Sequence, residues 1–441
     1  MRDFLLSVGA NPFYLAFAWF LAAFPIVIAA LAINSSRVFY LNRLSRETEI
    51  QNPHLEQLRH AQRVWPLASI VIPARDEQTY IEDTIDHALG LAWPAIEVIV
   101  INDGSTDGTD QVLQRFADHP KVTIIEHQAP VGKSRSLNEG IAAASSELVM
   151  ILDADAVPDI NVLARMASHF MVDQDVAAVT GNPRAIGIPN LLSKMQAIEF
   201  SSTISTLRRG QCAWGRINTV SGIMTLFRRS VVLNSGAFSS NQPTEDIEIT
   251  WRLHRMGYRC IYEPAASVGM HVPQDFTQWF AQRKRWSRGL VRVLQEHGWG
   301  IVRRNEWPMY PVMFEALLAI IWCHVLVFMT ALWAVALAVG AGLLGNSIVI
   351  GRWGAMTIGI ALVQILWGMH LDANHDKGIR KLWPLAPWYP LVYWWMQAFT
   401  VVWVTVPTLL TKQKTVSWDM VRSTRGTRAS RAFPAKSDST D

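Results

Sequence analysis

An uncharged apolar run occupies residues 13–33, and this feature most limits how the chain can fold. A helix of this length reaches about 31 Å, roughly the thickness of the hydrocarbon core of a bilayer. The run is too long for the apolar part of a signal peptide, and no small-residue cleavage site follows it. We therefore expect a retained transmembrane helix within residues 1–36. Arg37, Arg43 and Arg46 follow the run, so the positive-inside rule places what comes next in the cytoplasm.

Three more apolar segments lie near the C-terminus, at residues 311–344, 347–371 and 382–410. The first third of the last segment contains three prolines, which indicates a broken or interfacial stretch. We expect C-terminal transmembrane segments over residues 307–411. Three full spans would place the polar tail, residues 412–441, outside the cell, whereas its basic charge favours the inside. The number of spans therefore stays open.

The composition agrees with a globular part combined with membrane spans. Half of the residues are apolar, only 17% are charged, and 19 are tryptophan. The net charge of +4 resides entirely in the tail, so nothing indicates a nucleic-acid partner. The three cysteines lie far apart and show no metal-binding spacing, which is typical of reduced thiols in a cytosolic domain.

Between the membrane segments, short β-branched runs alternate with helical patterns. The expected strands are 69–73, 96–102, 122–126 and 148–153, and the expected helices are 77–89, 107–117 and 134–144. Continuous apolar strands between helices predict a parallel sheet covered on both faces, which is a doubly wound α/β domain. We assign this domain to residues 65–274, after a cytosolic linker at 37–64.

Charged side chains follow three of these strands, where ligands of such sheets bind. The three clusters are Arg75-Asp76-Glu77, Asp103 with its Gly104-Ser105 turn, and Asp153-Ala154-Asp155. Asp103 can accept hydrogen bonds from a base or a ribose, and the alternative is an ordinary turn. No G-x-G-x-x-G follows the first strand, which disfavours a dinucleotide site.

Asp153 and Asp155 follow an apolar strand. In an extended chain, alternation places both carboxylates on the same side. Two oxygen ligands facing one way suit Mg²⁺ or Mn²⁺, which also bridges a diphosphate. The alternative is that one of them caps the structure before Pro158.

Thr244-Glu245-Asp246 precedes an amphipathic helix. One interpretation is structural, with Thr244 as the N-cap and the two acids favouring the helix dipole. The other makes Asp246 a general base that takes a proton from an acceptor hydroxyl. The local sequence leaves both open.

The segment from Gln282 to Trp286, QRKRW, lies in an amphipathic pattern over residues 275–306. The structural interpretation is an interfacial helix, which does not exclude a function. Gln282 and Arg285 are one turn apart and can reach the same anion, because Arg suits bidentate phosphate binding. Trp286 can stack on a sugar ring.

In this order, the four polar clusters and the membrane segments resemble the processive family 2 glycosyltransferases, which include cellulose, chitin and hyaluronan synthases. The segments AVTGNPR, QAIEFSSTI, VSGIMTLFRRS and TEDIEITWRL are similar to the bacterial poly-β-1,6-N-acetylglucosamine synthases of the biofilm matrix. The resemblance covers residues 65–410 and implies a GT-A-like doubly wound mixed sheet inserted between transmembrane helices. One departure is the single expected N-terminal span, where the synthases of enteric bacteria have two.

The resemblance also implies a role for each matching position. The donor site would comprise Pro73, Arg75, Glu77, Asp103, Lys133, Asp153 and Ala154. Asp155, with Asp153, would ligate Mg²⁺ or Mn²⁺, and Asp246, with Glu245 beside it, would be the catalytic base. The acceptor and the diphosphate would meet Gln282, Arg285, Trp286, Ser221, Gly222, Asn182 and Arg184. Lys133 can equally be a solvated lysine at a helix start.

The implied activity is inverting, processive polymerisation of N-acetylglucosamine from UDP-N-acetylglucosamine, with translocation of a β-1,6-linked exopolysaccharide across the bacterial inner membrane. The catalytic domain of this multi-pass protein would be cytosolic. The residues alone distinguish neither the sugar nor the linkage, so a chitin, hyaluronan or cellulose type of synthase stays open. A non-processive polyprenyl-phosphate glycosyltransferase and a catalytically silent subunit that senses nucleotide stay open as well. The resemblance further implies a lipid bilayer, a small membrane subunit and cyclic di-GMP regulation as partners.

Overall fold

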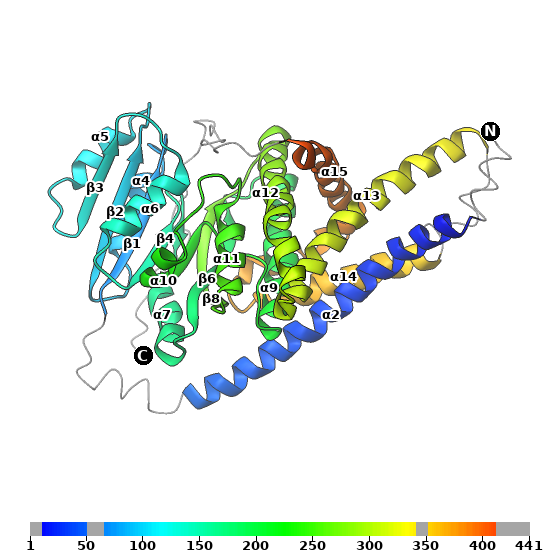
Figure 1. Cartoon of the computed structure of the whole chain (residues 1–441), viewed down its shortest axis with the longest axis horizontal. Coiled ribbons are helices and arrows are strands. Elements are labelled where there is room, and N and C mark those ends of the chain that lie inside the picture. The colour runs from blue at the N-terminus through cyan, green and yellow to red at the C-terminus, as the bar shows by residue number, and fades with distance from the viewer. Residues whose placement is uncertain (1–10, 51–65, 341–351, 412–441) are drawn as a thin grey trace. The chain divides into compact units, whose positions relative to one another are not determined.

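The computed structural model describes residues 11–50, 66–340 and 352–411, which form two compact units. Within these ranges, the sheet unit contains residues 48–50, 66–193 and 217–274. The helical unit contains residues 11–47, 194–216 and 275–411. The expected domain at 65–274 is therefore interrupted, because residues 194–216 join the helical unit. Figure 1 labels helices and strands from both units.

The sheet unit is built on one mixed sheet of eight strands in the order β3-β2-β1-β4-β7-β6-β8-β5. The strands are β1 (Ala68–Ala74), β2 (Ile96–Asp103), β3 (Val122–His127), β4 (Leu148–Leu152), β5 (Val157–Pro158), β6 (Val176–Ile186), β7 (Met224–Arg228) and β8 (Arg259–His271). β1 to β4 pair in parallel, whereas β7 runs antiparallel to β4 and β6. The doubly wound mixed sheet is thus confirmed, and its first four strands lie within one residue of their expected bounds.

Successive residues of a strand point to opposite sides of the sheet. Both sides carry buried apolar side chains, and helices cover both faces. The helices of the unit are α4 (Ile81–Leu89), α5 (Thr109–Leu113), η1 (Gln114–Phe116), α6 (Lys133–Ala143), α7 (Val162–Val172), α10 (Arg229–Asn234) and α11 (Glu245–Arg255). Ile70 and Ile72 of β1 join a core formed with α4, α5 and α7. Val71 points the other way, toward α6, where a Cβ on Gly140 would lie 2.5 Å from its Cγ1. The glycine lets α6 lie close to the sheet.

The helical unit contains three helices that are long and apolar enough to cross a membrane, counted over the described residues: Pro12–Arg43, Trp307–Ala338 and Gly354–Asp372. The elements of the unit are α2 (Pro12–Ile50), α8 (Leu191–Glu199), η2 (Phe200–Ile204), α9 (Ser205–Ala213), α12 (Phe276–Arg303), η3 (Trp307–Met309), α13 (Tyr310–Ala338), α14 (Arg352–Asp372), η5 (Lys377–Leu385), η6 (Tyr389–Tyr393) and α15 (Trp394–Leu410). α8 starts in the sheet unit, and α2 ends there.

The N-terminal apolar segment forms a helix that is long and apolar enough to cross a membrane, as expected, and this helix continues to Ile50 into the region expected to be a linker. The proline-rich start of the last apolar segment is a 3₁₀ helix, η5, followed by a π-helical turn, η6. Only the 17 residues of α15 remain as a regular helix, so this segment is shorter than the other spans. The rest of the expected linker, 51–64, and the basic tail, 412–441, lie outside the described residues.

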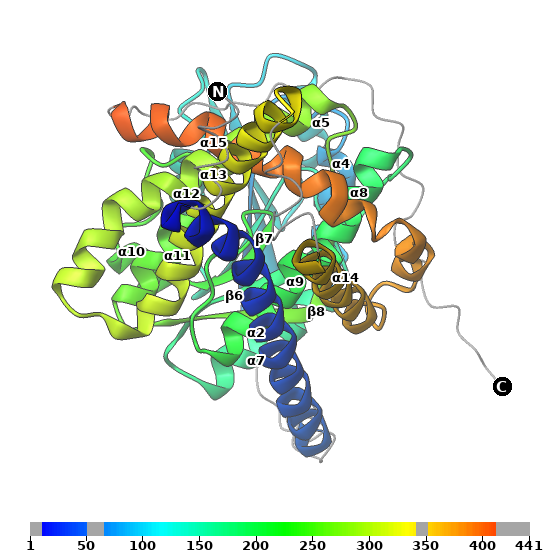
Figure 2. The ribbon, with the colours of Figure 1, turned by 90° about the vertical axis from the view of Figure 1, so that its right-hand side faces the viewer.

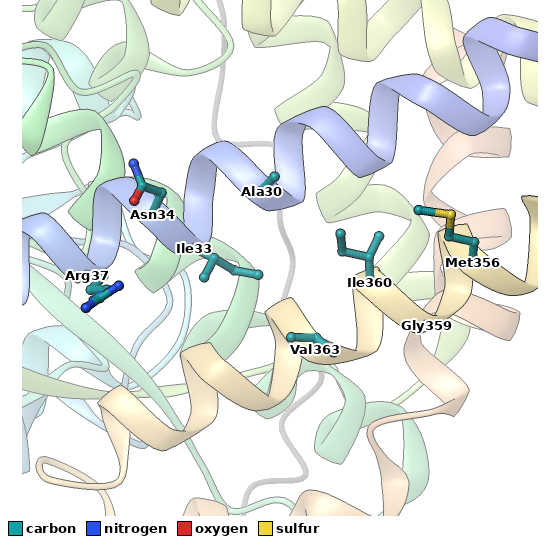
Figure 3. A pocket seen from close by; sticks show the side chains of 8 residues that line it. All are labelled: Ala30, Ile33, Asn34, Arg37, Met356, Gly359, Ile360 and Val363. Carbon is teal, nitrogen blue, oxygen red and sulfur yellow. The ribbon is translucent and has the colours of Figure 1, made fainter.

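α2 lies against three other helices of the helical unit, α13, α14 and α15. Tyr14 and Leu21 form an apolar cluster with α13 and α15, and the Trp333 Nε1 donates to the Tyr14 hydroxyl at 3.2 Å. α2 also lies beside α14 (Figure 2), and a groove of about 650 Å³ runs between the two helices. Small residues such as Ala30 and Gly359 are among those that line the groove, and Arg37 lies at one end (Figure 3).

Candidate active site

Two loops at the carboxyl edge of the sheet are tied together by polar contacts. The carboxylate of Asp76, after β1, accepts from the backbone N–H of Thr106, after β2, at 2.7 Å. The backbone N–H of Glu77 donates to Thr109 Oγ1 at 2.9 Å. Asp76 has a positive φ of 54°, a conformation that Asp tolerates better than most residues. The contacts hold the half-buried Arg75 at the end of β1, after Pro73 within the strand.

Asp103, the last residue of β2, is fully buried and organises the next loop. Its carboxylate accepts from the backbone N–H groups of Val131 and Gly132, both at 2.8 Å. Gly132 has a φ of 100°, which favours glycine, and α6 begins at the following residue, Lys133. Asp103 thus sets the position of Lys133. That Asp103 contacts the donor directly stays a prediction.

His127 is a site residue that the sequence reasoning missed. It ends β3 in register with Asp103, and its Nδ1 lies 2.7 Å from the Asp103 carboxylate. Its Nε2 lies 2.6 Å from the carboxylate of Glu139 on α6. Burial lowers the pKa of His127, but the hydrogen bonds to Asp103 and Glu139 outweigh burial and raise it above its usual value. The available signal was a polar residue at the same strand edge as the expected acids.

Asp153, Ala154 and Asp155 form a turn after β4. The N–H of Ala156 donates to the carbonyl of Asp153 at 3.0 Å, so the segment is not extended. The expectation that alternation along an extended chain orients both carboxylates is therefore wrong. Asp155 is buried and Asp153 is partly exposed, so the two carboxylates meet different surroundings.

Lys133 brings the polar clusters of the sheet unit together. Its ammonium lies 2.7 Å from Asp153 Oδ1 and 3.4 Å from Glu245 Oε1. Its side chain is 23% exposed, so the solvated alternative for Lys133 is wrong. A Cβ built on Gly222 would lie 3.7 Å from the same ammonium and 3.4 Å from Asp246 Oδ2. Residues from four distant segments thus converge on one charged centre.

The charges of this centre suit a hard cation. Burial raises the pKa of Asp153, and the charge of Lys133 opposes that shift. Two carboxylates beside one ammonium concentrate negative charge where an oxygen-ligated divalent ion would be stable. The residues present therefore fit Mg²⁺ or Mn²⁺, with Asp155 in the same turn.

Asp246 lies at the start of α11, and its role as a general base stays a prediction. Thr244 precedes α11 without a side-chain cap. Asp246 Oδ2 accepts from the N–H of Gly222 at 3.2 Å, and its Oδ1 accepts from the N–H of Ile247 at 2.9 Å. The backbone of Ser221 is fixed in turn by a 2.7 Å bond from its N–H to Thr180 Oγ1. Because Asp246 is partly exposed, its carboxylate stays accessible to an acceptor hydroxyl.

The remaining expected site residues lie elsewhere. Asn182 and Arg184 are buried on β6, where Asn182 Nδ2 donates to the carbonyl of Pro264 at 3.0 Å. Gln282, Arg285 and Trp286 lie on α12 of the helical unit, with Gln282 buried and the other two partly buried. That α12 and the acidic centre act on the same substrate remains a prediction.

Comparison with known proteins identifies relatives over most of the chain. The family model of glycosyl transferase family 2 matches residues 69–235. The poly-β-1,6-N-acetyl-D-glucosamine synthase of Staphylococcus aureus (strain COL) is 32% identical over 402 residues, covering 90% of this chain and 95% of that protein. The synthase of the same name from Staphylococcus epidermidis is 32% identical over 348 residues, covering 78% of this chain and 84% of that protein.

A solved structure shows the same fold. A mannosyltransferase from Pyrobaculum calidifontis, determined with GDP-mannose and Mn²⁺, superposes with a TM-score of 0.53 and 22% sequence identity. The match covers 78% of this chain and 98% of that one. At this identity the likeness supports the GT-A-like sheet and says nothing about the sugar.

Proposed function

The chain belongs to glycosyl transferase family 2 and is a membrane glycosyltransferase, and we propose that it polymerises N-acetylglucosamine from UDP-N-acetylglucosamine into a β-1,6-linked exopolysaccharide. The observation that carries this proposal is the charged centre of the sheet unit. There Lys133 contacts Asp153 and Glu245. Gly222 lies beside both the Lys133 ammonium and the Asp246 carboxylate. The relatives with the same name over most of the chain support the choice of sugar and linkage.

The donor is held by charge. Lys133 faces the diphosphate, and Arg75, Glu77 and Asp103 line or shape the nucleotide pocket at the ends of β1 and β2. Asp153 and Asp155 would hold Mg²⁺ or Mn²⁺. The ion, when bound, neutralises the charge that develops on the departing UDP. Lys133 contributes to the same neutralisation, which makes UDP a good leaving group.

Asp246 is the general base. Its carboxylate, oriented by the N–H groups of Gly222 and Ile247, removes the proton from the acceptor hydroxyl. The acceptor oxygen then attacks the anomeric carbon in line with the bond to UDP, and that bond breaks with its electron pair on the diphosphate. A single displacement inverts the α linkage of the donor to a β linkage in the product.

The helical unit binds the acceptor end of the growing polymer. Gln282 and Arg285 on α12 bind the diphosphate, and Trp286 stacks on the acceptor sugar at the mouth of a path between the membrane helices. We place the sheet unit in the cytosol of a bacterium and the helices in its inner membrane, because Arg37 and Arg43 follow the first span. Synthesis is processive, and the polymer leaves through the same protein. A small membrane subunit and cyclic di-GMP complete the proposed regulation.

The decisive experiment offers the purified full-length protein a panel of UDP-sugars and determines the length and linkage of the product. We expect a long β-1,6-linked polymer from UDP-N-acetylglucosamine only. A different sugar, a different linkage, or a single sugar on a lipid acceptor would overturn the proposal.

Replacing Asp246 tests the mechanism. Asp246→Asn should lower turnover by about 10²- to 10⁴-fold, the usual contribution of a general base. UDP binding should persist, because Asp153 and Glu245, which contact Lys133 directly, keep their charges. Asp159→Asn is the matched control, since Asp159 pairs with Arg165 on a different part of the sheet unit. Unchanged turnover in Asp246→Asn removes this residue from the mechanism.

A further inference from the structure

Arg283, one residue after Gln282 on α12, forms a bidentate ion pair inside the helical unit. Its Nη1 donates to Glu199 Oε1 at 2.8 Å, and its Nη2 donates to Glu199 Oε2 at 2.6 Å. Both side chains are buried, at 6% and 4% exposure. A two-point contact between a planar guanidinium and a carboxylate fixes the orientation of both groups.

Further polar groups complete the surroundings of this pair. The Tyr393 hydroxyl donates to Glu199 Oε2 at 3.0 Å and accepts from Arg283 Nη2 at 3.2 Å and from Trp279 Nε1 at 2.7 Å. Gln397 Nε2 donates to Glu199 Oε1 at 2.6 Å. Arg283 Nε has no hydrogen-bond partner among the described residues, but both terminal nitrogens are bonded. The ion pair is therefore rigid, because moving it would break several hydrogen bonds at once.

Two partners of Arg283 lie at the ends of π-helical turns. Glu199 directly precedes the turn η2, and Tyr393 ends the turn η6. Such turns are rare, and they occur frequently at functional sites. Here two of them, far apart in sequence, converge on one guanidinium.

The guanidinium also contacts the aromatic residue of the same motif. Arg283 Cζ lies 4.3 Å from the centroid of the Trp286 ring, which is within the range of a cation–π contact. Glu199 and Tyr393 therefore fix Arg283, and Arg283 in turn limits the orientations of Trp286.

We propose that Glu199 and Arg283 are positioning residues that hold the Trp286 ring in the orientation that receives the acceptor sugar. This inference rests on the proposed function, because it takes Trp286 as the acceptor platform. It predicts that loosening the pair releases the growing chain early while donor handling in the sheet unit continues.

The same unit contains a matched control. Arg209 Nη2 pairs with Asp372 Oδ1 at 2.7 Å, and these side chains are 3% and 0% exposed. This pair joins α9 to the end of α14, away from the QRKRW segment in sequence. Breaking either pair leaves a buried charge without its partner and lowers stability by the same mechanism. Of the two pairs, only that of Arg283 touches Trp286.

The experiment compares Glu199→Gln, Arg283→Lys and Asp372→Asn in the full-length protein, in membranes. The readouts are the KM for donor, the initial rate and the distribution of product lengths, each per folded molecule. For the first two variants we expect chains shorter by roughly three- to thirty-fold, the factors that exposed and desolvated cation–π contacts represent. The donor KM should stay unchanged. Asp372→Asn should unfold at a lower temperature but make chains of normal length.

A double variant keeps the test valid if the single variants fold poorly. Replacing both members of a buried ion pair by apolar side chains restores or exceeds the original stability in many proteins. Glu199→Leu combined with Arg283→Met should therefore unfold near the wild-type temperature and still release short chains. Normal chain length in this double variant, or equal shortening in Asp372→Asn, overturns the positioning role.

The proposed function can fail separately. If the wild type transfers only single sugars, polymerisation is wrong, and the positioning role is then tested by the KM for acceptor. Glu199→Gln and Arg283→Lys must raise this KM while the donor KM stays constant. An unchanged acceptor KM overturns the inference.

Discussion

His127 lies between two carboxylates, and we expect this contact to make the stability of the sheet unit depend on pH. The ring contacts Asp103 on β2 and Glu139 on α6, and these partners raise its pKa above the usual value. A group with a raised folded-state pKa stabilises fully below its unfolded pKa, near 6.5, and the stabilisation disappears as pH rises through the folded pKa. Asp103 also fixes the loop before Lys133. We therefore expect the loss of this stabilisation to loosen the position of Lys133 in the candidate active site.

We predict that the unfolding temperature of the detergent-solubilised protein falls as pH rises from about 6 to about 9. His127→Gln should remove this part of the pH dependence, with a change of roughly 2–4 °C for about 1 kcal/mol in a domain of this size. The exposed His87→Gln serves as the control. Identical pH profiles for the wild type and His127→Gln would show that the ring carries no such proton.

At the scale of single residues, the sequence predicted which kinds of side chain form the site better than it predicted which of them contact one another. Of the acids expected at strand ends, Asp153 takes part in the charged centre, whereas Asp103 and Asp76 bind loop backbone. That Lys133 joins Asp153 to Glu245 was not visible, since the contact spans more than a hundred residues. His127 was missed because one histidine at a strand end has no distinctive pattern.

At the scale of elements, α14 approaches its neighbours at a glycine. A Cβ on Gly368 would lie 2.3 Å from Thr206 Oγ1 and 2.6 Å from the carbonyl of Ser202. On the same helix, Gly359 faces the groove beside α2 and has no atom within 4 Å of such a Cβ (Figure 3). One face of α14 therefore requires glycine, and the other does not.

Gly368→Ala should destabilise the helical unit by about 1–3 kcal/mol, the usual cost of overpacking a close contact. Gly359→Ala should be neutral or slightly stabilising, because alanine favours a helix and the space is open. Thermal unfolding of the two purified variants checks both expectations. Equal stability would mean that η2 moves away from α14 without cost.

Elements were predictable where hydrophobic patterns are regular. Apolar runs defined β1 to β4 and the first membrane helix, because burial on both faces or in lipid requires them. The turn at Asp153–Asp155 was missed because a single N–H to carbonyl bond at Ala156 decides it. The π-helical turns η2 and η6 were missed for a related reason, since a shift of the hydrogen bond from i−4 to i−5 leaves the apolar pattern unchanged.

At the scale of the whole molecule, the helical unit contains more buried charge than an anchor needs. Arg283 pairs with Glu199, and Arg209 pairs with Asp372, all four within the unit. Ionisable groups inside membrane proteins face the protein interior or a water-filled path, and they often mark a route for a polar substrate. A hydrophilic polymer cannot cross hydrocarbon unaided, so we expect the enzyme that makes it to provide such a route.

Sealed vesicles with the sheet unit facing outward test this coupling. Given labelled UDP-N-acetylglucosamine outside, wild-type vesicles should accumulate polymer that an added polymer-specific hydrolase degrades only after detergent opens the membrane. Vesicles with Asp246→Asn should contain about 10²- to 10⁴-fold less labelled polymer, which excludes adsorbed donor as the source. Polymer that is fully degraded before detergent is added lies on the donor side, and this result would separate synthesis from translocation and require another protein for export.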